Sequence, residues 1–217
     1  MITGKSRKEK MSKEVKEEKE KAFVVGNGLS RKKFDLKKIQ GKGKIFGCNA
    51  LYRDFPVDYL IAFDDKILSE IIKNNFDRTK LIVPIPEERY EPAIFNPYRP
   101  RENAGMVAMR EAIKKGHDHL YILGMDFLLE DYSLNVKNVY DGTFGYELNT
   151  RASFEDTQRR FVYFIWFAQQ NPNVKFTAVF PSGQILYRNI NNFKDATPNL
   201  RYISFEDLLD EIDENNK

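Results

Sequence analysis

The chain alternates short apolar runs with stretches whose apolar residues recur every three or four positions. The short runs lack a strict alternation of apolar and polar residues, which is typical of strands buried on both faces. The longer stretches have the spacing of amphipathic helices. The pattern predicts strands at 22–25, 44–49, 59–64, 80–85, 119–126, 174–180 and 201–204, and helices at 66–73, 103–115, 153–170 and 205–213.

The order of these elements predicts the fold class. Strands separated by helices join through parallel crossovers, and strands without a polar face need helices on both sides of their sheet. We therefore expect an α/β protein with a three-layer Rossmann-like domain and a mostly parallel sheet, formed by a single domain over 22–217. Gly116 is the expected stop of one helix, and Ser153 with Asp156 is the expected N-terminal cap of another.

The segment 1–21 differs from the rest of the chain because it is almost entirely charged. Its eight basic and five acidic residues account for all of the formal net charge of +3. Such a segment has no apolar stripe to bury, so we expect a disordered tail or a solvated helix. The remaining chain is neutral. That argues against a nucleic-acid binder, since phosphate backbones are met by a clustered basic face.

The cysteine and histidine content limits the chemistry further. The one cysteine, Cys48, cannot form an internal disulfide, and with only His117 and His119 a Cys/His zinc site cannot be assembled. Both histidines begin a predicted strand, so we expect them at the surface. No apolar run reaches the roughly 18 residues of a membrane span. These features predict a cytoplasmic protein without a transmembrane segment.

Ligands of an open parallel sheet bind outside the carboxyl ends of its strands, so the residues that end the predicted strands are the first site candidates. Gly26, Asn27 and Gly28 end the first strand, where absent side chains let backbone N–H groups approach a phosphate. The sequence is not the dinucleotide fingerprint G-x-G-x-x-G, because Arg31 stands in place of the third glycine. The alternative is a tight turn that binds nothing.

Three further strand ends carry polar side chains. Asn49 has the donor and acceptor to bind a base or ribose edge, or it caps the next turn. Asp64 and Asp65 are potential ligands of a divalent cation, although consecutive strand residues point to opposite faces. Asp126 ends the most apolar strand, so its carboxylate either faces a cleft or ties down a neighbouring loop by hydrogen bonds.

Two regions outside the strand ends complete the candidates. Arg101 precedes the helix at 103–115, whose first turn offers free N–H groups, and together these make a good anion site. The polar segment 128–152 is longer than most connections, which indicates a lid or an acceptor-binding loop. Its polar and aromatic side chains include Tyr132, Tyr140, Asp141, Thr143, Tyr146 and Glu147.

Three segments in this order resemble the bacterial sialyltransferases of glycosyltransferase family 42. They are V-V-G-N-G-L-S with F-D-L-K-K-I, then F-G-C-N, then R-E-N-A-G leading through a helix into L-Y-I-L-G-M-D-F. The likeness extends over roughly residues 22 to 130. It implies a Rossmann-like nucleotide-binding domain that uses a CMP-linked nucleotide sugar as donor substrate, needs no metal cofactor, and transfers the sugar to a glycan or other hydroxyl acceptor.

The resemblance also implies roles for individual residues. It implies donor-binding roles for Asn27, Asn49, Arg101, Ala104 and Gly105, beside the turn of Gly26, Gly28 and Ser30, and it makes Asp126 the aspartate of the G-x-D-F motif. The chain departs from the family at Ala104, where the family has serine, and at Leu128, where it has tyrosine. The family's downstream histidine base has no counterpart. Because transfer needs a base for the acceptor hydroxyl, Asp141 and Glu147 are the candidates.

Two other functions remain open at this stage. The G-x-G-x-S and G-M-D-F pair also occurs in archaeal 6-hydroxymethylpterin pyrophosphokinase-like proteins, which would make this chain a magnesium-dependent phosphotransferase with Asp64 and Asp65 as ligands. A catalytically silent nucleotide- or glycan-binding module is the other alternative. A homo-oligomer is also left open.

Overall fold

A computed structural model describes residues 20–85, 102–129, 137–147, 153–184 and 197–214. In these residues seven parallel strands form one sheet in the order β4-β3-β2-β1-β5-β6-β7. The fold is therefore the predicted Rossmann-like α/β arrangement. The strands are β1 (Ala22–Val25), β2 (Lys44–Cys48), β3 (Tyr59–Ile61), β4 (Leu81–Ile82), β5 (His119–Leu123), β6 (Lys175–Phe180) and β7 (Leu200–Ser204).

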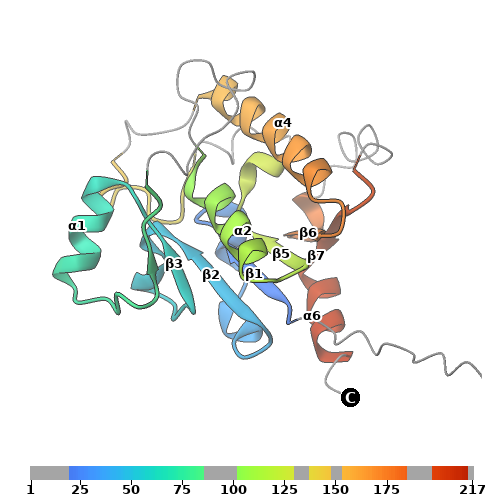
Figure 1. Cartoon of the computed structure of the whole chain (residues 1–217), viewed down its shortest axis with the longest axis horizontal. Helices are drawn as coiled ribbons and strands as arrows, with labels where there is room; N and C mark the ends of the chain where they lie inside the picture. Colours follow the sequence, from blue (N-terminus) through green and yellow to red (C-terminus); the bar gives the residue numbers. More distant parts are fainter. Residues whose placement is uncertain (1–19, 86–101, 130–136, 148–152, 185–196, 215–217) are drawn as a thin grey trace, which may run out of the picture.

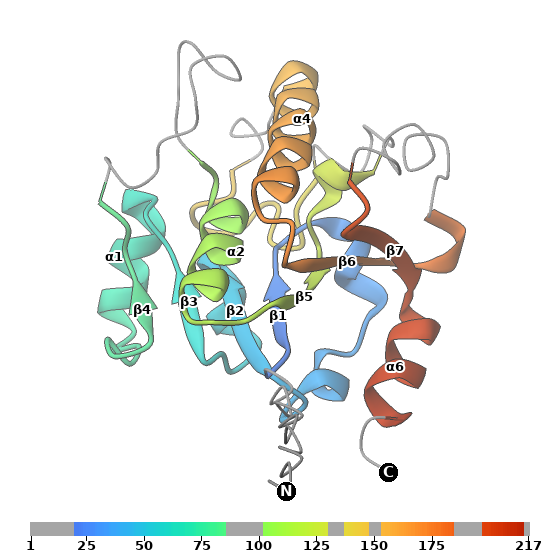
Figure 2. The same ribbon diagram turned by 45° about the vertical axis from the view of Figure 1, so that its right-hand side comes forward.

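Helices cover both faces of the sheet, giving three layers (Figure 1). One face carries α2 (Ala104–Lys114) and α4 (Phe154–Gln170), and the other carries α1 (Asp65–Lys73) and α6 (Phe205–Glu214). Figure 2 shows α4 and α6 on opposite sides of β6 and β7. The sheet is thus buried on both faces, which explains why its strands lack a polar alternation.

The predicted helix boundaries are confirmed by their caps. The Asn103 side chain accepts a hydrogen bond from the Met106 N–H at 3.0 Å, which starts α2. The Ser153 hydroxyl accepts from the Asp156 N–H at 3.1 Å, which starts α4. Gly116 follows α2 with a φ of +93°, a left-handed conformation that suits glycine.

Several predicted strands end earlier than the apolar runs suggested. β5 stops at Leu123 rather than at Asp126, because Gly124 adopts a φ of +65° and turns the chain. β3 stops at Ile61, and Asp64 becomes the residue before α1. The polar residues at these ends lie in turns beyond the sheet, so the pleat of the strands does not dictate where their side chains point.

The expectation that both histidines lie at the surface is wrong. His117 is 8% exposed, packs edge-on against Phe46, and its Nδ1 lies 2.6 Å from the Glu20 carbonyl oxygen. His119 is partly buried, and its Nε2 lies 3.0 Å from the Thr177 hydroxyl. Burial, followed by nearby cations, lowers the pKa of His119 to about 4. Both histidines lie near the amino ends of the strands, away from the carboxyl ends at which sheets of this kind bind ligands.

Two expectations, on the charged segment 1–21 and on membrane spans, concern residues that the structure describes only in part. Most of the charged segment 1–21 lies outside the described residues. Among the described residues, no helix is long and apolar enough to span a membrane.

The strand order defines where the chain reverses direction across the sheet. After β1 the chain builds β2, β3 and β4 on one side, then crosses back through α2 to place β5 on the other side of β1. The crevice between the carboxyl ends of β1 and β5 is thus the topological switch point, the usual ligand position in such sheets.

Truncating Phe164 should lower the free energy of unfolding by roughly 3–5 kcal/mol. Phe164 is fully buried in α4, with its ring near Phe127 and Phe176. Val162 on the same helix is 49% exposed, so Val162→Ala is the matched control and should change stability by about 0.5 kcal/mol or less. Urea denaturation of Phe164→Ala and Val162→Ala measures both. Equal losses in the two variants would contradict this account of the core.

Candidate functional site

The site is built on two turns that touch each other at the switch point. The Gly26 N–H donates to the Leu123 carbonyl oxygen and the Gly28 N–H to that of Gly124, each at 2.8 Å. A Cβ added to Gly26 would lie 2.5 Å from the Gly124 oxygen, which is closer than packed atoms allow. The glycines that end β1 are therefore required by this close approach of backbones.

A cleft of about 210 Å³ opens above these turns. It is bounded by the residues after β1, β2 and β5, by the first turn of α2 and by α4. Of the residues named from the sequence, the cleft brings together eight: Gly26, Asn27, Gly28, Asn49, Ala104, Gly105, Asp126 and Tyr146. Its lining runs from Gly26 to Arg160, so residues up to 134 positions apart in the chain line one space.

Asp126 holds the turn after β1 in place. Its carboxylate accepts from the Ser30 N–H at 3.0 Å and from the Ser30 hydroxyl, and the residue is 5% exposed. Burial raises the pKa of the Asp126 carboxyl, and the hydrogen bonds from Ser30 act against that rise. Ser30 therefore reaches the site through Asp126 and does not line the cleft.

Both the nitrogen and the oxygen of the Asn27 side-chain amide are hydrogen-bonded to the protein. Its Nδ2 donates to the Cys48 carbonyl oxygen at 2.9 Å and to the Tyr146 hydroxyl oxygen at 3.2 Å. Its Oδ1 accepts from the Arg31 Nη2 at 3.3 Å. Asn27 thus joins the turn after β1 to the end of β2 and to Tyr146, and Cys48 itself is buried, with its pKa raised to about 12 by that burial.

Asn49 has two features that mark a binding residue. Its φ is +49°, a left-handed conformation that asparagine tolerates better than other side chains with a Cβ. Its Nδ2 donates to Asp64 Oδ2 at 3.2 Å, which fixes the amide orientation. The Oδ1 is buried and has no hydrogen-bond partner among the described residues. A ligand that donates a hydrogen bond would satisfy this acceptor.

The first turn of α2 forms part of the wall of the cleft. Ala104 and Gly105 line the cleft, and Asn103 caps the Met106 N–H. Glu102, 3% exposed, anchors this helix start by binding Arg110 and by accepting from the Tyr163 hydroxyl at 2.6 Å. Arg101, the predicted anion-binding arginine, lies outside the described residues.

Sequence reasoning missed several groups that complete the cleft, among them Lys137 and Arg160, whereas Tyr146 was among the residues named in the polar segment 128–152. Lys137 and Arg160 add positive charge beside the α2 N-terminus. Burial raises the pKa of Tyr146 to about 12, so its hydroxyl stays protonated. Arg160 lies in the first half of the predicted helix 153–170, and Lys137 lies in the segment 128–152, but no motif in the sequence marks either residue as part of a site.

The segment 137–147 is tied to the body of the protein by several contacts. The Val139 N–H donates to the Asn27 carbonyl oxygen at 2.8 Å, and Gly28 and Asn138 form an antiparallel bridge. Arg53 donates to the Thr143 hydroxyl and to the Phe144 carbonyl oxygen, each at 2.8 Å, while pairing with Glu70. These contacts carry Tyr146 into the cleft.

Four predicted carboxylates do not line the cleft. Glu147 pairs with Lys66 at 2.9 Å, and that hydrogen bond lowers its pKa. Asp141 lies in the turn that begins at Asn138. Asp64 binds Asn49, and Asp65 is exposed in the first turn of α1. No group of three His, Cys, Asp or Glu side chains able to hold a metal ion occurs in the described part of the chain.

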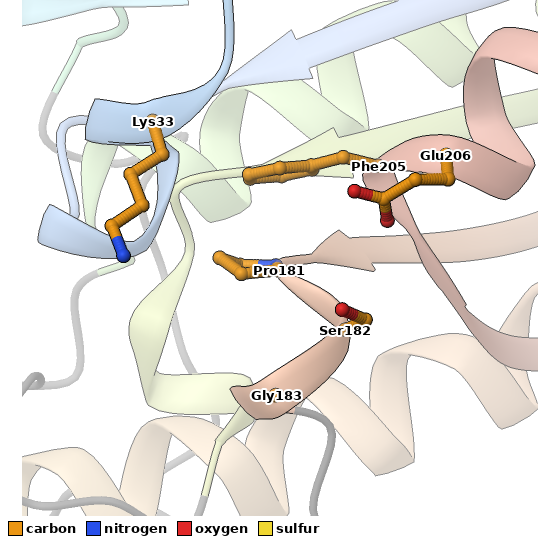
Figure 3. Close-up of a pocket in the computed structure, with 6 residues that line it drawn as sticks. All are labelled: Lys33, Pro181, Ser182, Gly183, Phe205 and Glu206. Atoms are coloured by element: carbon orange, nitrogen blue, oxygen red, sulfur yellow. The ribbon is translucent and has the colours of Figure 1, made fainter.

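A larger cavity of about 480 Å³ lies beyond the carboxyl ends of β6 and β7. Figure 3 shows Pro181, Ser182 and Gly183 from the segment after β6, with Phe205 and Glu206 from the start of α6 and Lys33 opposite them. Its polar side chains are exposed at its rim. The smaller cleft is the better candidate site, because it holds buried polar groups and lies at the switch point.

Replacing Ser30 by alanine should raise the pKa of Asp126 further, because one of the donors that stabilise its ionised form is lost. The raised folded-state pKa means that ionisation costs stability as the pH climbs from about 3.9, the unfolded value, through the folded one. Ser30→Ala should enlarge that cost. Carbon-detected NMR titration of Asp126 measures the shift, and Ser69→Ala, at an exposed serine, is the control. An unchanged Asp126 titration in Ser30→Ala would contradict the assignment.

Comparisons with known proteins place the fold in context. No protein-family model matches the chain, and no curated protein matches it. Among solved structures it is similar to the sialyltransferase CstII from Campylobacter jejuni in complex with a substrate analogue, CMP-3FNeuAc. The identity is 14%, the alignment covers 79% of this chain and 84% of CstII, and the TM-score is 0.43.

Proposed function

We propose that this protein is a sialyltransferase-like glycosyltransferase that binds a CMP-type nucleotide sugar and transfers the sugar to a hydroxyl acceptor without a metal ion. One observation carries the proposal. The segments whose motifs resemble the family are distant in the chain, yet Asn27, Asn49, the Ala104–Gly105 turn and Asp126 meet at one cleft. Parallel strands bring their carboxyl ends together in any such fold, so the support comes from the types of residue that the cleft gathers and not from their convergence alone.

The nucleotide is assigned to the side of the cleft nearest Asn49. The buried Oδ1 of Asn49 lacks a donor, and a ribose hydroxyl or a base amino group supplies one. Asn27 has its amide engaged by the protein, so its contribution is to orient Tyr146 and the end of β2. This division of roles refines the expectation that both asparagines contact the donor directly.

The phosphate is assigned to the first turn of α2. Ala104 and Gly105 present backbone N–H groups there, and Lys137, Arg160 and Tyr146 surround the same space. Such groups stabilise the negative charge that develops on the departing nucleotide when the glycosidic bond breaks. Arg101, which precedes this turn in the chain, is proposed to add a forked donor to the same anion.

The base that deprotonates the acceptor is proposed to be Asp141 or Glu147. Pairing with Lys66 lowers the pKa of Glu147, and a lowered pKa makes a carboxylate a weaker base. Both carboxylates belong to the segment 137–147, which brings Tyr146 into the cleft, so both are tested by substitution. Asp126 is proposed to act on the reaction through position, since both its oxygens hold Ser30.

Nucleotide binding should depend on the amide of Asn49. Asn49→Gly keeps the left-handed backbone but removes the amide, whereas Asn49→Ala removes the amide and strains the backbone. Both should weaken CMP binding about tenfold, equivalent to about 1.4 kcal/mol, in isothermal titration calorimetry. Asn75, also at positive φ but at the end of α1, gives the matched control, and Asn75→Gly should leave binding unchanged. Absence of CMP binding by the unmodified protein would end the proposal.

Turnover with and without metal separates this function from its rivals. Incubation with CMP-sialic acid and a panel of glycan acceptors should release CMP at the same rate in EDTA and in magnesium. A magnesium-dependent phosphotransferase would instead need ATP and magnesium and would lose activity in Asp64→Asn. If neither substrate is turned over while CMP binds, the silent binding module is the correct reading.

A further inference from the structure

Arg31, which takes the place of the third glycine of a dinucleotide fingerprint, is buried directly behind the cleft. It is 5% exposed. Its Nε donates to the Gly26 carbonyl oxygen at 2.6 Å, and its Nη2 donates to Asn27 Oδ1 at 3.3 Å and to the Tyr140 hydroxyl oxygen at 3.2 Å. Gly26 and Asn27 both line the cleft, so the guanidinium supports its floor from below.

The turn after β5 leaves space for the Arg31 side chain, because Gly124 in that turn has no Cβ. A Cβ on Gly124 would lie 3.0 Å from Arg31 Cδ, so a side chain there would crowd the arginine. The ring of Tyr140 covers the guanidinium, with 5.7 Å between Arg31 Cζ and the ring centroid. Arg31 is therefore a packed component of the floor and not a surface residue folded inward.

The buried charge of Arg31 meets neutral hydrogen-bond acceptors in the part of the chain that the structure describes. Each acceptor that it contacts is neutral: two carbonyl-type oxygens and a phenol. Among the described residues, no carboxylate lies within ion-pairing distance of it. Asp126 feels its charge from farther away, and Asp54 is reached only through the Tyr140 hydroxyl, which donates to Asp54 Oδ2 at 2.7 Å. A buried cation without a paired anion is costly, and an anionic ligand in the cleft would offset that cost.

The contacts of Arg31 also set the direction of a hydrogen-bond chain. A guanidinium only donates and the Cys48 carbonyl oxygen only accepts, so the Asn27 amide turns its Oδ1 toward Arg31 and its Nδ2 toward Cys48 and Tyr146. The Tyr146 oxygen accepts from Asn27, which leaves the Tyr146 proton to be donated. No acceptor for that proton occurs among the described residues, and Tyr146 lines the cleft.

We propose that Arg31 is a positioning residue for an anionic ligand group, acting as its buried counter-charge and holding Asn27 so that Tyr146 donates to that group. The proposal rests on the proposed function for the identity of the anion, a nucleotide phosphate. It assigns to this chain a cation beneath the cleft at the position where a dinucleotide fingerprint has glycine. A neutral nucleoside gains nothing from Arg31, whereas its 5′-phosphate does.

The test compares CMP with cytidine on four single variants and one double variant by calorimetry. Arg31→Gln removes the charge and the forked donor that holds the Asn27 Oδ1, and Arg31→Lys keeps the charge with fewer donors. Tyr146→Phe removes the hydroxyl at the end of the chain. Arg201→Gln, which removes an equal charge from the pair with Glu211 on the edge strand β7, is the control. Circular dichroism checks that each variant is folded.

Arg31→Gln should weaken CMP binding about tenfold and cytidine binding less than twofold, with Arg31→Lys losing less and Arg201→Gln unchanged. The loss in the double variant Arg31→Gln/Tyr146→Phe should be smaller than the product of the two single losses, because part of the Arg31 effect acts through the Tyr146 donor. A loss shared equally by CMP and cytidine, or an additive double variant, overturns the proposal. If Arg31→Gln does not fold, Arg31→Lys decides alone: a loss restricted to CMP supports the proposal, and an equal loss for both ligands rejects it.

A second probe separates this inference from the proposed function. Inorganic pyrophosphate should raise the thermal midpoint of the unmodified protein and of Arg31→Lys, but not that of Arg31→Gln. If this occurs while CMP fails to bind, the inference stands and the proposed function is wrong. If CMP binds and its preference over cytidine is the same in every variant, the proposed function stands and the inference is wrong. No stabilisation by pyrophosphate together with no CMP binding rejects both.

Discussion

The site depends on the contact between the turns that follow β1 and β5. Two hydrogen bonds, Gly26 N–H to Leu123 and Gly28 N–H to Gly124, hold the two backbones so closely that neither Gly26 nor Gly124 has room for a Cβ. Because the strand order reverses between these strands, the joined turns form the floor of the cleft at the switch point. The polar side chains of Asp126, Arg31 and Asn27 belong to these turns or are hydrogen-bonded to them.

Hydrogen bonds between buried polar residues connect this contact to the rest of the site. Asp126 fastens Ser30, Arg31 fastens the Gly26 carbonyl and the Asn27 amide, and Asn27 joins β2 and Tyr146 to the same unit. Polar groups in a low-dielectric interior are costly when unpaired, so a network of this kind has few alternative arrangements. The rigidity that results is what a site needs to hold charge in a set place.

The electrostatic character of the cleft is local and differs from that of the whole chain. The body of the protein is neutral in formal charge, yet the α2 N-terminus, Lys137 and Arg160 line the cleft, and Arg31 lies beneath it. A net charge averages over the surface, whereas a ligand responds to the potential inside a partly desolvated space. Anion binding is therefore compatible with a neutral composition.

The sequence by itself determined the elements and which strand ends matter, because burial on both faces removes polar alternation and parallel sheets present their carboxyl ends together. It also singled out Asn49, the 103–105 helix start and Asp126. Only the tertiary structure decided what each does: Asn27 and Ser30 bind the protein, Asn49 keeps an unpaired acceptor, and Arg31, which looked like a defect in a glycine motif, lies under the cleft. Local pattern reports burial and backbone period, but the partner of a polar side chain lies up to 119 positions away and is chosen by packing.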